Sequence, residues 1–360
     1  MIPEHDLFFP GRDTELLLAL REQVWGSNHP HTDARFFDWI YARTPKDTPA
    51  GIMVRHQERA VGFAGICPKR QWVAGREVGL AHGLDYMIQP GLPDMLTGRV
   101  ALRVAHRWMQ LVEERNFSFG LVFPNSNSMR ILTSPRVGMS PLFEPALLIR
   151  PLPSARFTER IRGVPGRALS MATRVAALSS WVRVSDYGRP RGEAEPVEHF
   201  DEGFDALWLQ ARDTLDASTV RDAAYLNWRF REHPLYRYQV VGWRQDGAWL
   251  GYVVCVERRL FGVDTLLVVD ILSPQIQSVG PALIDAVSDD AHRRGLGIVV
   301  TLAIPGGRLH EIFKSRGFIQ VPARLNPKRF TATVQVYDDA LRPALAAMSR
   351  HFTWSDMDVV

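Results

Sequence analysis

The sequence contains the same order of elements twice, and this internal repeat restricts the possible folds more than any other feature of the chain. Residues 34–45 and 223–234 share, in register, an aromatic residue, an acid or amide, a tryptophan (Trp39 and Trp228) and a closing proline. A repeat on this scale indicates two copies of one structural plan rather than a single large domain.

The elements that follow these segments repeat as well. Each copy continues with two strand-like runs, and in the second copy the runs are joined by Asp246-Gly247, a strong hairpin signal. These runs lie at residues 51–56, 60–67, 238–243 and 249–257. A further strand, an amphipathic helix, another strand and a short helix ending at a glycine (Gly138 or Gly317) complete each copy. We therefore predict two tandem α/β domains.

The length of 360 residues is sufficient for two domains of about 100–200 residues each. We assign residues 1–150 to the N-terminal domain, 151–195 to a basic linker and 196–360 to the C-terminal domain. Within the linker, residues 168–184 could form a helix with one apolar face. Such a helix either packs across the two domains or rests as a basic surface on an anionic membrane, and its periodicity is compatible with both.

Composition excludes several classes of protein. The net charge of +4, from 43 basic and 39 acidic residues, is small and spread along the chain, so we expect no nucleic-acid partner. Cys67 and Cys255 lie inside apolar runs without metal-ligand spacing, which predicts buried thiols and neither a metal site nor a disulfide. Because the sequence shows no signal-peptide pattern and no run of about 18 apolar residues, we expect no transmembrane segment and a cytoplasmic location.

One segment of the C-terminal copy points to a ligand. Gln277-Ser278-Val279-Gly280-Pro281-Ala282 lies between a strand and the helix that follows it. Free amides at the start of a helix, with a glycine that permits close approach, suit a pyrophosphate. The segment matches the signature Gln/Arg-x-x-Gly-x-Gly/Ala, and with the later helix ending at Gly317-Phe318 it resembles the GNAT N-acyltransferase superfamily. The resemblance covers nearly the whole chain apart from the linker and implies two tandem GNAT-like domains, each with a mixed α/β sheet.

This resemblance implies that acetyl-CoA or another acyl-CoA binds, without a metal, where two central strands splay apart. The pantetheine arm would pair with the backbone of Ile271 and Leu272, and residues 277–282 would hold the pyrophosphate. Asp270 is the candidate base that takes the proton of the acceptor, and the alternative is a strand-end aspartate that holds backbone amides. Phe313 would line the site where many members have a tyrosine, so it has no proton to give to the leaving thiolate.

The N-terminal copy shows a different pattern. Asn127 occupies the family's asparagine position relative to Gly138, but the loop at 93–100 has one glycine and fits the CoA signature poorly. We therefore predict that this copy is degenerate for CoA and serves as a scaffold or as a wall of the acceptor site. In an alternative hypothesis, the acceptor site lies at a cleft between the two copies. For the two tryptophans of that hypothesis, packing in the core is the simpler expectation. The residues of that alternative are Trp39, Asp85, Trp228 and Arg229.

These observations predict an acyltransferase that moves an acyl group from CoA to an amine or hydroxyl of a small molecule or sugar by direct attack. Residues 225–234 and 352–358 are similar to tandem GNAT proteins of bacterial exopolysaccharide and capsule systems, which indicates a role in polysaccharide biosynthesis. Two alternatives remain. One is a catalytically silent GNAT-like binding or scaffold module, which Phe313 favours. The other is a Fem-like peptidyltransferase, whose usual basic coiled-coil insertion has no heptad counterpart in this sequence.

Overall fold

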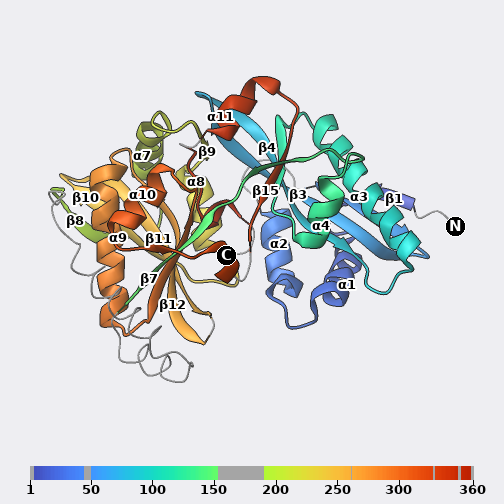
Figure 1. Cartoon of the computed structure of the whole chain (residues 1–360), viewed down its shortest axis with the longest axis horizontal. Helices are drawn as coiled ribbons and strands as arrows, with labels where there is room; N and C mark the ends of the chain where they lie inside the picture. The colour runs from blue at the N-terminus through green and yellow to red at the C-terminus, as the bar shows by residue number, and fades with distance from the viewer. Residues whose placement is uncertain are drawn as a thin grey trace. The chain divides into compact units, whose positions relative to one another are not determined.

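A computed structural model describes residues 4–43, 50–152, 190–260, 262–326, 329–347 and 350–357 of the chain (Figure 1). Most of the predicted linker, including the helix expected at 168–184, lies outside the described residues. The described residues form two compact units, and each unit contains a mixed β-sheet. No helix among them is long and apolar enough to cross a membrane.

The first unit comprises Met1–Glu144, Glu232–Leu235 and Phe330–Ala346. Its sheet runs in the order β1-β2-β3-β4-β5-β15-β6. The strands are β1 (Glu4–Leu7), β2 (Ala50–His56), β3 (Arg59–Val73), β4 (Arg76–Ile88), β5 (Phe119–Val122), β6 (Ser140–Phe143) and β15 (Ala332–Val336). The helices are α1 (Thr14–Trp25), η1 (Pro30–Thr32), α2 (Ala34–Ala42), α3 (Asp94–Glu114), α4 (Ser126–Leu132), η4 (Asp339–Leu341) and α11 (Arg342–Ala346).

The second unit comprises Pro145–Arg231, Tyr236–Arg329 and Ala347–Val360, and its sheet runs in the order β14-β7-β13-β12-β11-β10-β8. The strands of this sheet are β7 (Ala146–Pro151), β8 (Glu193–Pro196), β10 (Gln239–Gln245), β11 (Ala248–Leu260), β12 (Val263–Leu272), β13 (Ile298–Ala303) and β14 (Ile319–Gln320), and the short strand β9 (Ala217–Thr219) is not part of it. The helices are α7 (Glu202–Arg212), α8 (Ala223–Leu226), the π-helical η2 (Asn227–Arg231), α9 (Ile276–Arg293), α10 (Arg308–Ser315), η3 (Ala323–Leu325) and η5 (Trp354–Asp356).

Each sheet contains at least one strand from the other half of the sequence. In the first unit β15 pairs antiparallel with β5 and β6, and in the second unit β7 pairs antiparallel with β13 and β14. The structural units therefore do not coincide with the sequence boundaries at 150 and 195. The hydrophobic pattern of a strand shows which of its faces is buried, but it does not show which sheet the strand joins.

Local signals explain where several elements begin and turn. Asp246 and Gly247 both have left-handed φ angles, 50° and 82°, and form the two-residue turn between β10 and β11 that the sequence predicts. Asp33 and Asn125 accept hydrogen bonds from backbone N–H groups at the starts of α2 and α4, as capping residues do.

Buried apolar side chains fix the long helices on their sheets. The face of α3 that carries Val100, Val104 and Trp108 belongs to the core of the first unit, and the corresponding face of α9 belongs to that of the second. Trp39 and Trp228 are both buried, which confirms the expected core packing of these side chains. Cys67 and Cys255 are free and buried, as predicted.

Candidate functional site

The strands β4 and β5 separate within the sheet of the first unit. Their parallel pairing runs from Leu80 opposite Phe119 to Gly83 opposite Val122, and β4 then continues to Ile88 beside β3. Asp85 and Tyr86 together oppose one residue of β3, so β4 carries a β-bulge just beyond the last pair. The bulge brings Asp85 into a left-handed conformation, with a φ of 55°.

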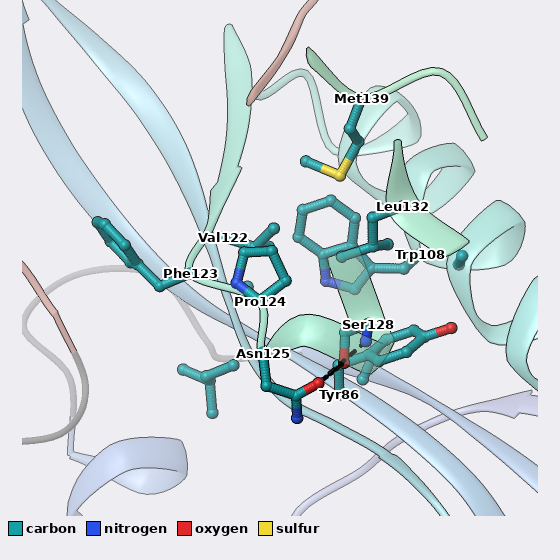
Figure 2. A pocket seen from close by; sticks show the side chains of 13 residues that line it. Tyr86, Trp108, Val122, Phe123, Pro124, Asn125, Ser128, Leu132 and Met139 are labelled. Carbon is teal, nitrogen blue, oxygen red and sulfur yellow. Dashed lines mark hydrogen bonds between the residues drawn. The ribbon is translucent and has the colours of Figure 1, made fainter. Parts of the chain in front are cut away.

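A cavity of about 100 Å³ lies where these strands separate (Figure 2). Residues of β4, α3, α4 and the segment after β5 line it. Two of its aromatic walls are held by hydrogen bonds: the Trp108 Nε1 donates to the carbonyl of Gly65 (3.0 Å), and the Tyr86 hydroxyl donates to the carbonyl of Ala101 (2.7 Å). Because these polar groups are satisfied within the protein, both rings present fixed, largely apolar surfaces to the cavity.

Asn125 supplies an amide at the edge of this cavity. Its Oδ1 accepts hydrogen bonds from the backbone N–H of Asn127 (3.0 Å) and of Ser128 (2.9 Å), and from the Ser128 hydroxyl (3.1 Å). These bonds fix the amide so that its Nδ2 faces away from α4 (Figure 2), and this nitrogen has no hydrogen-bond partner among the described residues. The sequence singled out Asn127, but the structure places Asn127 in the first turn of α4 and Asn125 at the cavity.

The other face of the bulge carries a buried ion pair. Arg21 of α1 forms an ion pair with Asp85, and the Tyr41 hydroxyl of α2 donates to the same carboxylate (2.8 Å). The Nδ1 of His31 lies 3.8 Å from Asp85 Oδ1. Burial by itself raises the pKa of Asp85, but the charge of Arg21, together with the nearby imidazole of His31, outweighs it and holds this pKa well below its ordinary value. Asp85 is therefore an ionised carboxylate that orients its neighbours.

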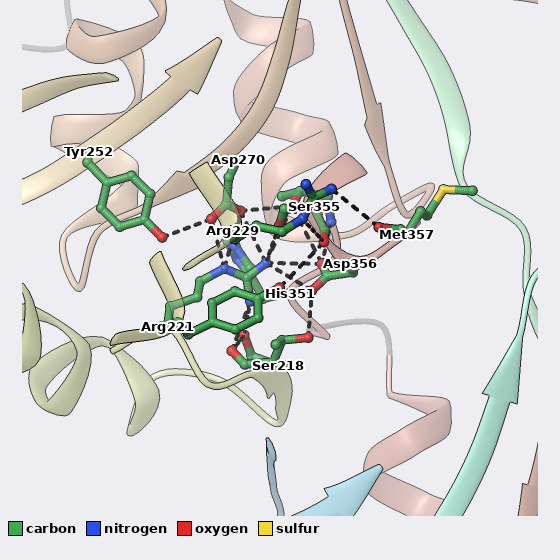
Figure 3. Close-up of polar contacts among 12 residues, drawn as sticks. Ser218, Arg221, Arg229, Tyr252, Asp270, His351, Ser355, Asp356 and Met357 are labelled. Atoms are coloured by element: carbon green, nitrogen blue, oxygen red, sulfur yellow. Dashed lines mark hydrogen bonds and ion pairs between the residues drawn. The ribbon is translucent and has the colours of Figure 1, made fainter. Parts of the chain in front are cut away.

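The second unit has a corresponding network around Asp270 on β12 (Figure 3). The guanidinium of Arg221 donates to both carboxylate oxygens of Asp270 at 3.0–3.2 Å and also to Asp356 at 3.0–3.1 Å. The hydroxyls of Tyr252 and Thr353 each donate to Asp270 at 2.8 Å. His351 completes the network, with its Nε2 4.0 Å from Asp270 Oδ1.

This environment favours a structural role for Asp270 over the catalytic role that the sequence proposed. Asp270 is fully buried, and burial by itself raises its pKa, but Arg221 and the hydrogen bonds to Asp270 lower the pKa below its ordinary value. A general base must reach the proton of the acceptor and have a lone pair free for it. The oxygens of Asp270 instead accept hydrogen bonds from side chains of the protein, rather than from the backbone amides of the alternative prediction.

The predicted pyrophosphate loop is helical. Gln277, Ser278, Val279, Gly280, Pro281 and Ala282 all lie in α9, which begins at Ile276. The backbone N–H groups of Ser278 and Val279 donate to the carbonyl of Gln275 (3.0 Å each), and the side chains from 279 to 282 are buried. Pro281 lies inside the helix and not in its first turn, which corrects the expected placement. Of the six residues, Gln277 alone is exposed.

The other predicted CoA contacts also lie in the core of the second unit. Ile271 and Leu272 are buried and pair with Val253 and Tyr252 of β11. The parallel pairing of β12 with β13 ends at Leu267 opposite Val300, so these strands separate as β4 and β5 do. Phe313 is fully buried, and its ring packs edge-on against Phe318 at 4.9 Å.

Several residues that the structure brings together are not marked by any motif or periodicity in the sequence. His31 and Arg21 reach Asp85 from helices that precede the first hairpin. Arg221 precedes Asp270 by 49 residues and Thr353 follows it by 83, and Asp356 lies close to Thr353 in the chain. Such sets depend on contacts between distant positions, which neither periodicity nor short motifs report. Among the described residues, no three His, Cys, Asp or Glu side chains are placed so that they could hold a metal ion.

Comparison with known proteins identifies the fold. No protein-family model matches this sequence, and no curated protein does. A solved GCN5-related N-acetyltransferase from Anabaena variabilis superposes with a TM-score of 0.62 and 13% identity, covering 92% of this chain and 73% of the other. A probable N-acyltransferase from Enterococcus faecalis gives a TM-score of 0.63 at 12% identity, covering 92% of this chain and 72% of the other.

A third solved structure also superposes over most of this chain. Saccharomyces cerevisiae N-myristoyltransferase with bound myristoyl-CoA superposes with a TM-score of 0.57 and 10% identity, covering 93% of this chain and 79% of the other. At these identities the likeness shows the fold and nothing finer. The chain consists of two tandem GNAT-like α/β domains, which confirms the predicted fold class.

Proposed function

We propose that this protein is an acyl-CoA-dependent acyltransferase whose acyl-CoA site lies in the first unit, between β4 and β5. The observation that carries the proposal is the cavity at the point where these two strands separate. The sequence favoured the second unit and residues 277–282, but there the amides of Ser278 and Val279 are already bonded within α9. The solved relatives by fold include N-acetyltransferases and a myristoyl-CoA complex, which supports the choice of substrate.

The backbone of β4 suits the pantetheine arm of CoA. Beyond Gly83 the edge of β4 that faced β5 has no strand partner among the described residues, so its N–H and C=O groups are open on that side. The amide groups of pantetheine can pair with such an edge as an added strand does. The thioester then lies beside the bulge at Asp85 and Tyr86, next to the cavity.

The size of the cavity favours a short acyl group. At about 100 Å³ it is smaller than the cavity of ~150 Å³ that accommodates a benzene ring in a protein core. A space of this size accommodates an acetyl group. In this proposal the Nδ2 of Asn125, a residue of the cavity lining, donates to the oxyanion that forms when the thioester carbonyl is attacked.

The acceptor in this proposal is an amine or hydroxyl on a small molecule or a sugar, which attacks the thioester directly. The similarity of residues 225–234 and 352–358 to tandem GNAT proteins of exopolysaccharide and capsule systems supports a sugar acceptor and a role in polysaccharide biosynthesis.

The test compares matched substitutions in the two units. Val122 is half-buried at the cavity, and Val122→Phe extends its side chain into the gap between β4 and β5. We expect this change to weaken acetyl-CoA binding at least tenfold, about 1.4 kcal/mol, in isothermal titration calorimetry. Gln277→Glu is the control: it places a negative charge at the exposed start of α9, where it disturbs CoA only if the pyrophosphate binds there.

The outcomes separate the candidate sites and functions. Weakened binding in Gln277→Glu with unchanged binding in Val122→Phe would place the site in the second unit, as the sequence predicted. Absence of any binding of acetyl-CoA to the wild-type protein would refute the proposed function. Binding without acetyl transfer to a panel of amines and sugars would favour the catalytically silent module.

A further inference from the structure

His31 occupies an unusual position on the loop between α1 and α2. It lies in η1, its ring stacks on Phe36 with a centroid distance of 4.6 Å, and its Nδ1 lies 3.8 Å from Asp85 Oδ1. The side chain is 15% exposed, whereas that of Asp85 is 2% exposed. His31 is therefore the member of the Asp85 network that reaches solvent.

The charged and titratable groups around His31 come from four elements. Asp85 faces it from β4, and Arg21 of α1 forms an ion pair with Asp85 and donates from Nη1 to the His31 carbonyl (2.9 Å). Tyr41 of α2 donates to the same carboxylate, and the ring of His29, on the loop that leads into η1, lies 5.0 Å from that of His31. The negative charge of Asp85 is thus shared between Arg21 and the Nδ1 side of His31.

This arrangement orients the imidazole. A carboxylate on the Nδ1 side favours the tautomer with the proton on Nδ1, which leaves the Nε2 lone pair available. The Nε2 of His31 has no hydrogen-bond partner among the described residues. Asp85 lies on β4 between Leu84 and Tyr86, two residues that line the cavity. The carboxylate nearest to the imidazole therefore belongs to the stretch of β4 that borders the proposed thioester site.

We propose that His31 is the general base of acyl transfer and that Asp85 is its positioning residue, an inference that rests on the proposed function. The lone pair of the acceptor nitrogen or oxygen attacks the thioester carbonyl carbon, and Nε2 of His31 takes the proton that the acceptor loses. The tetrahedral intermediate collapses with cleavage of the C–S bond. The thiolate of CoA leaves and is protonated by the imidazolium, which returns His31 to its neutral form.

Thiol release from acetyl-CoA tests this role, because water can replace an acceptor that is not yet identified. We expect His31→Gln to lower the rate of thiol release, with water and with a panel of amine and sugar acceptors, about 10²-fold. The dissociation constant for acetyl-CoA stays within twofold of wild type, since His31 lies outside the cavity lining. His199→Gln, at an exposed histidine of the second unit, is the control and keeps the wild-type rate.

Two readouts distinguish a base from a structural residue. With water as the acceptor, the wild-type rate falls at acidic pH, and this fall is absent in His31→Gln. Imidazole added to His31→Ala restores part of the rate. Wild-type thiol release in His31→Gln, or an unchanged acid limb, overturns the role of His31 alone. A wild-type protein that neither binds acetyl-CoA nor releases thiol overturns the proposed function, and the role of His31 with it.

Discussion

The two units each contain a buried aspartate on a central strand, and they differ in what surrounds it. Asp85 in the first unit is paired with one arginine and one tyrosine, and its histidine is partly exposed. Asp270 in the second unit shares its arginine with Asp356 and also accepts from Thr353, and its histidine, His351, is almost fully buried. The comparison shows how one duplicated plan can keep a partly exposed polar network in one copy and a sealed one in the other.

The segment that seals the second unit is the end of the described chain. Thr353 and Asp356 belong to the turn at η5, whose capping box holds the turn in place, and the Asp356 carboxylate pairs with Arg221. The corresponding network of the first unit is covered by the η1 loop, which leaves His31 accessible. In the proposed division of roles the first unit carries the chemistry and the second provides a stable partner domain.

The largest expected effect comes from removing the two arginines. Arg221→Met leaves two carboxylates, Asp270 and Asp356, without their cation, and loss of one partner of a buried ion pair costs about 3–5 kcal/mol. Arg21→Met leaves only Asp85, with His31 nearby, so we expect a smaller loss of stability. Denaturant titrations followed by hydrogen exchange in peptides of each unit measure the two losses separately. Equal losses would contradict the proposed difference between the networks.

The second prediction concerns pH. Burial, together with the charge of Arg221, lowers the pKa of His351 from its ordinary value of 6.5 to about 4. As the pH falls, the unfolded chain binds this proton before the folded chain does. The stabilising contribution of neutral His351 to the free energy of unfolding is therefore fully present above about pH 6.5 and is lost as the pH falls towards 4. The shift corresponds to about 3 kcal/mol. We expect His351→Gln to flatten the decline in stability of the second unit over this range, and an unchanged decline would refute the assignment.

The smallest effects come from a matched pair of tyrosines. Tyr41→Phe and Tyr252→Phe each remove a hydroxyl that donates to a buried carboxylate at 2.8 Å, a bond worth about 1.5–3 kcal/mol. Asp270 keeps Arg221 and Thr353 as donors, whereas Asp85 keeps Arg21 as its one close donor in the described structure, so Tyr41→Phe is expected to cost more. Urea unfolding curves of the two variants give the order, and the reverse order would show that the first network is the better satisfied.

Part of the site could be predicted from the sequence because it depends on local pattern. Asp85 and Asp270 were both named from the sequence as candidate site residues, and the helical spacing of Val100, Val104 and Trp108 predicts the packed face of α3. The sequence named Asn127, two residues from Asn125, which the structure places at the cavity. The sequence shows that a turn follows the strand, but it does not show which residue caps the short helix after it. The signature at 277–282 lies inside α9, and the sequence does not show this because a glycine inside a helix and a glycine in a phosphate loop can have the same local sequence.

By itself, then, the sequence determined the duplication, the order of strands and helices, the two-domain α/β class and the burial of both tryptophans and both cysteines. Only the tertiary structure decided that β7 and β15 join the sheets of opposite halves, that Asp270 is sealed by Arg221 and Thr353, and that the cavity lies beside Asp85. The physical reason is the range of the interactions. Turns, caps and amphipathic faces depend on residues a few positions apart, whereas strand pairing, ion pairs and cavities depend on side chains that folding brings together from distant parts of the chain.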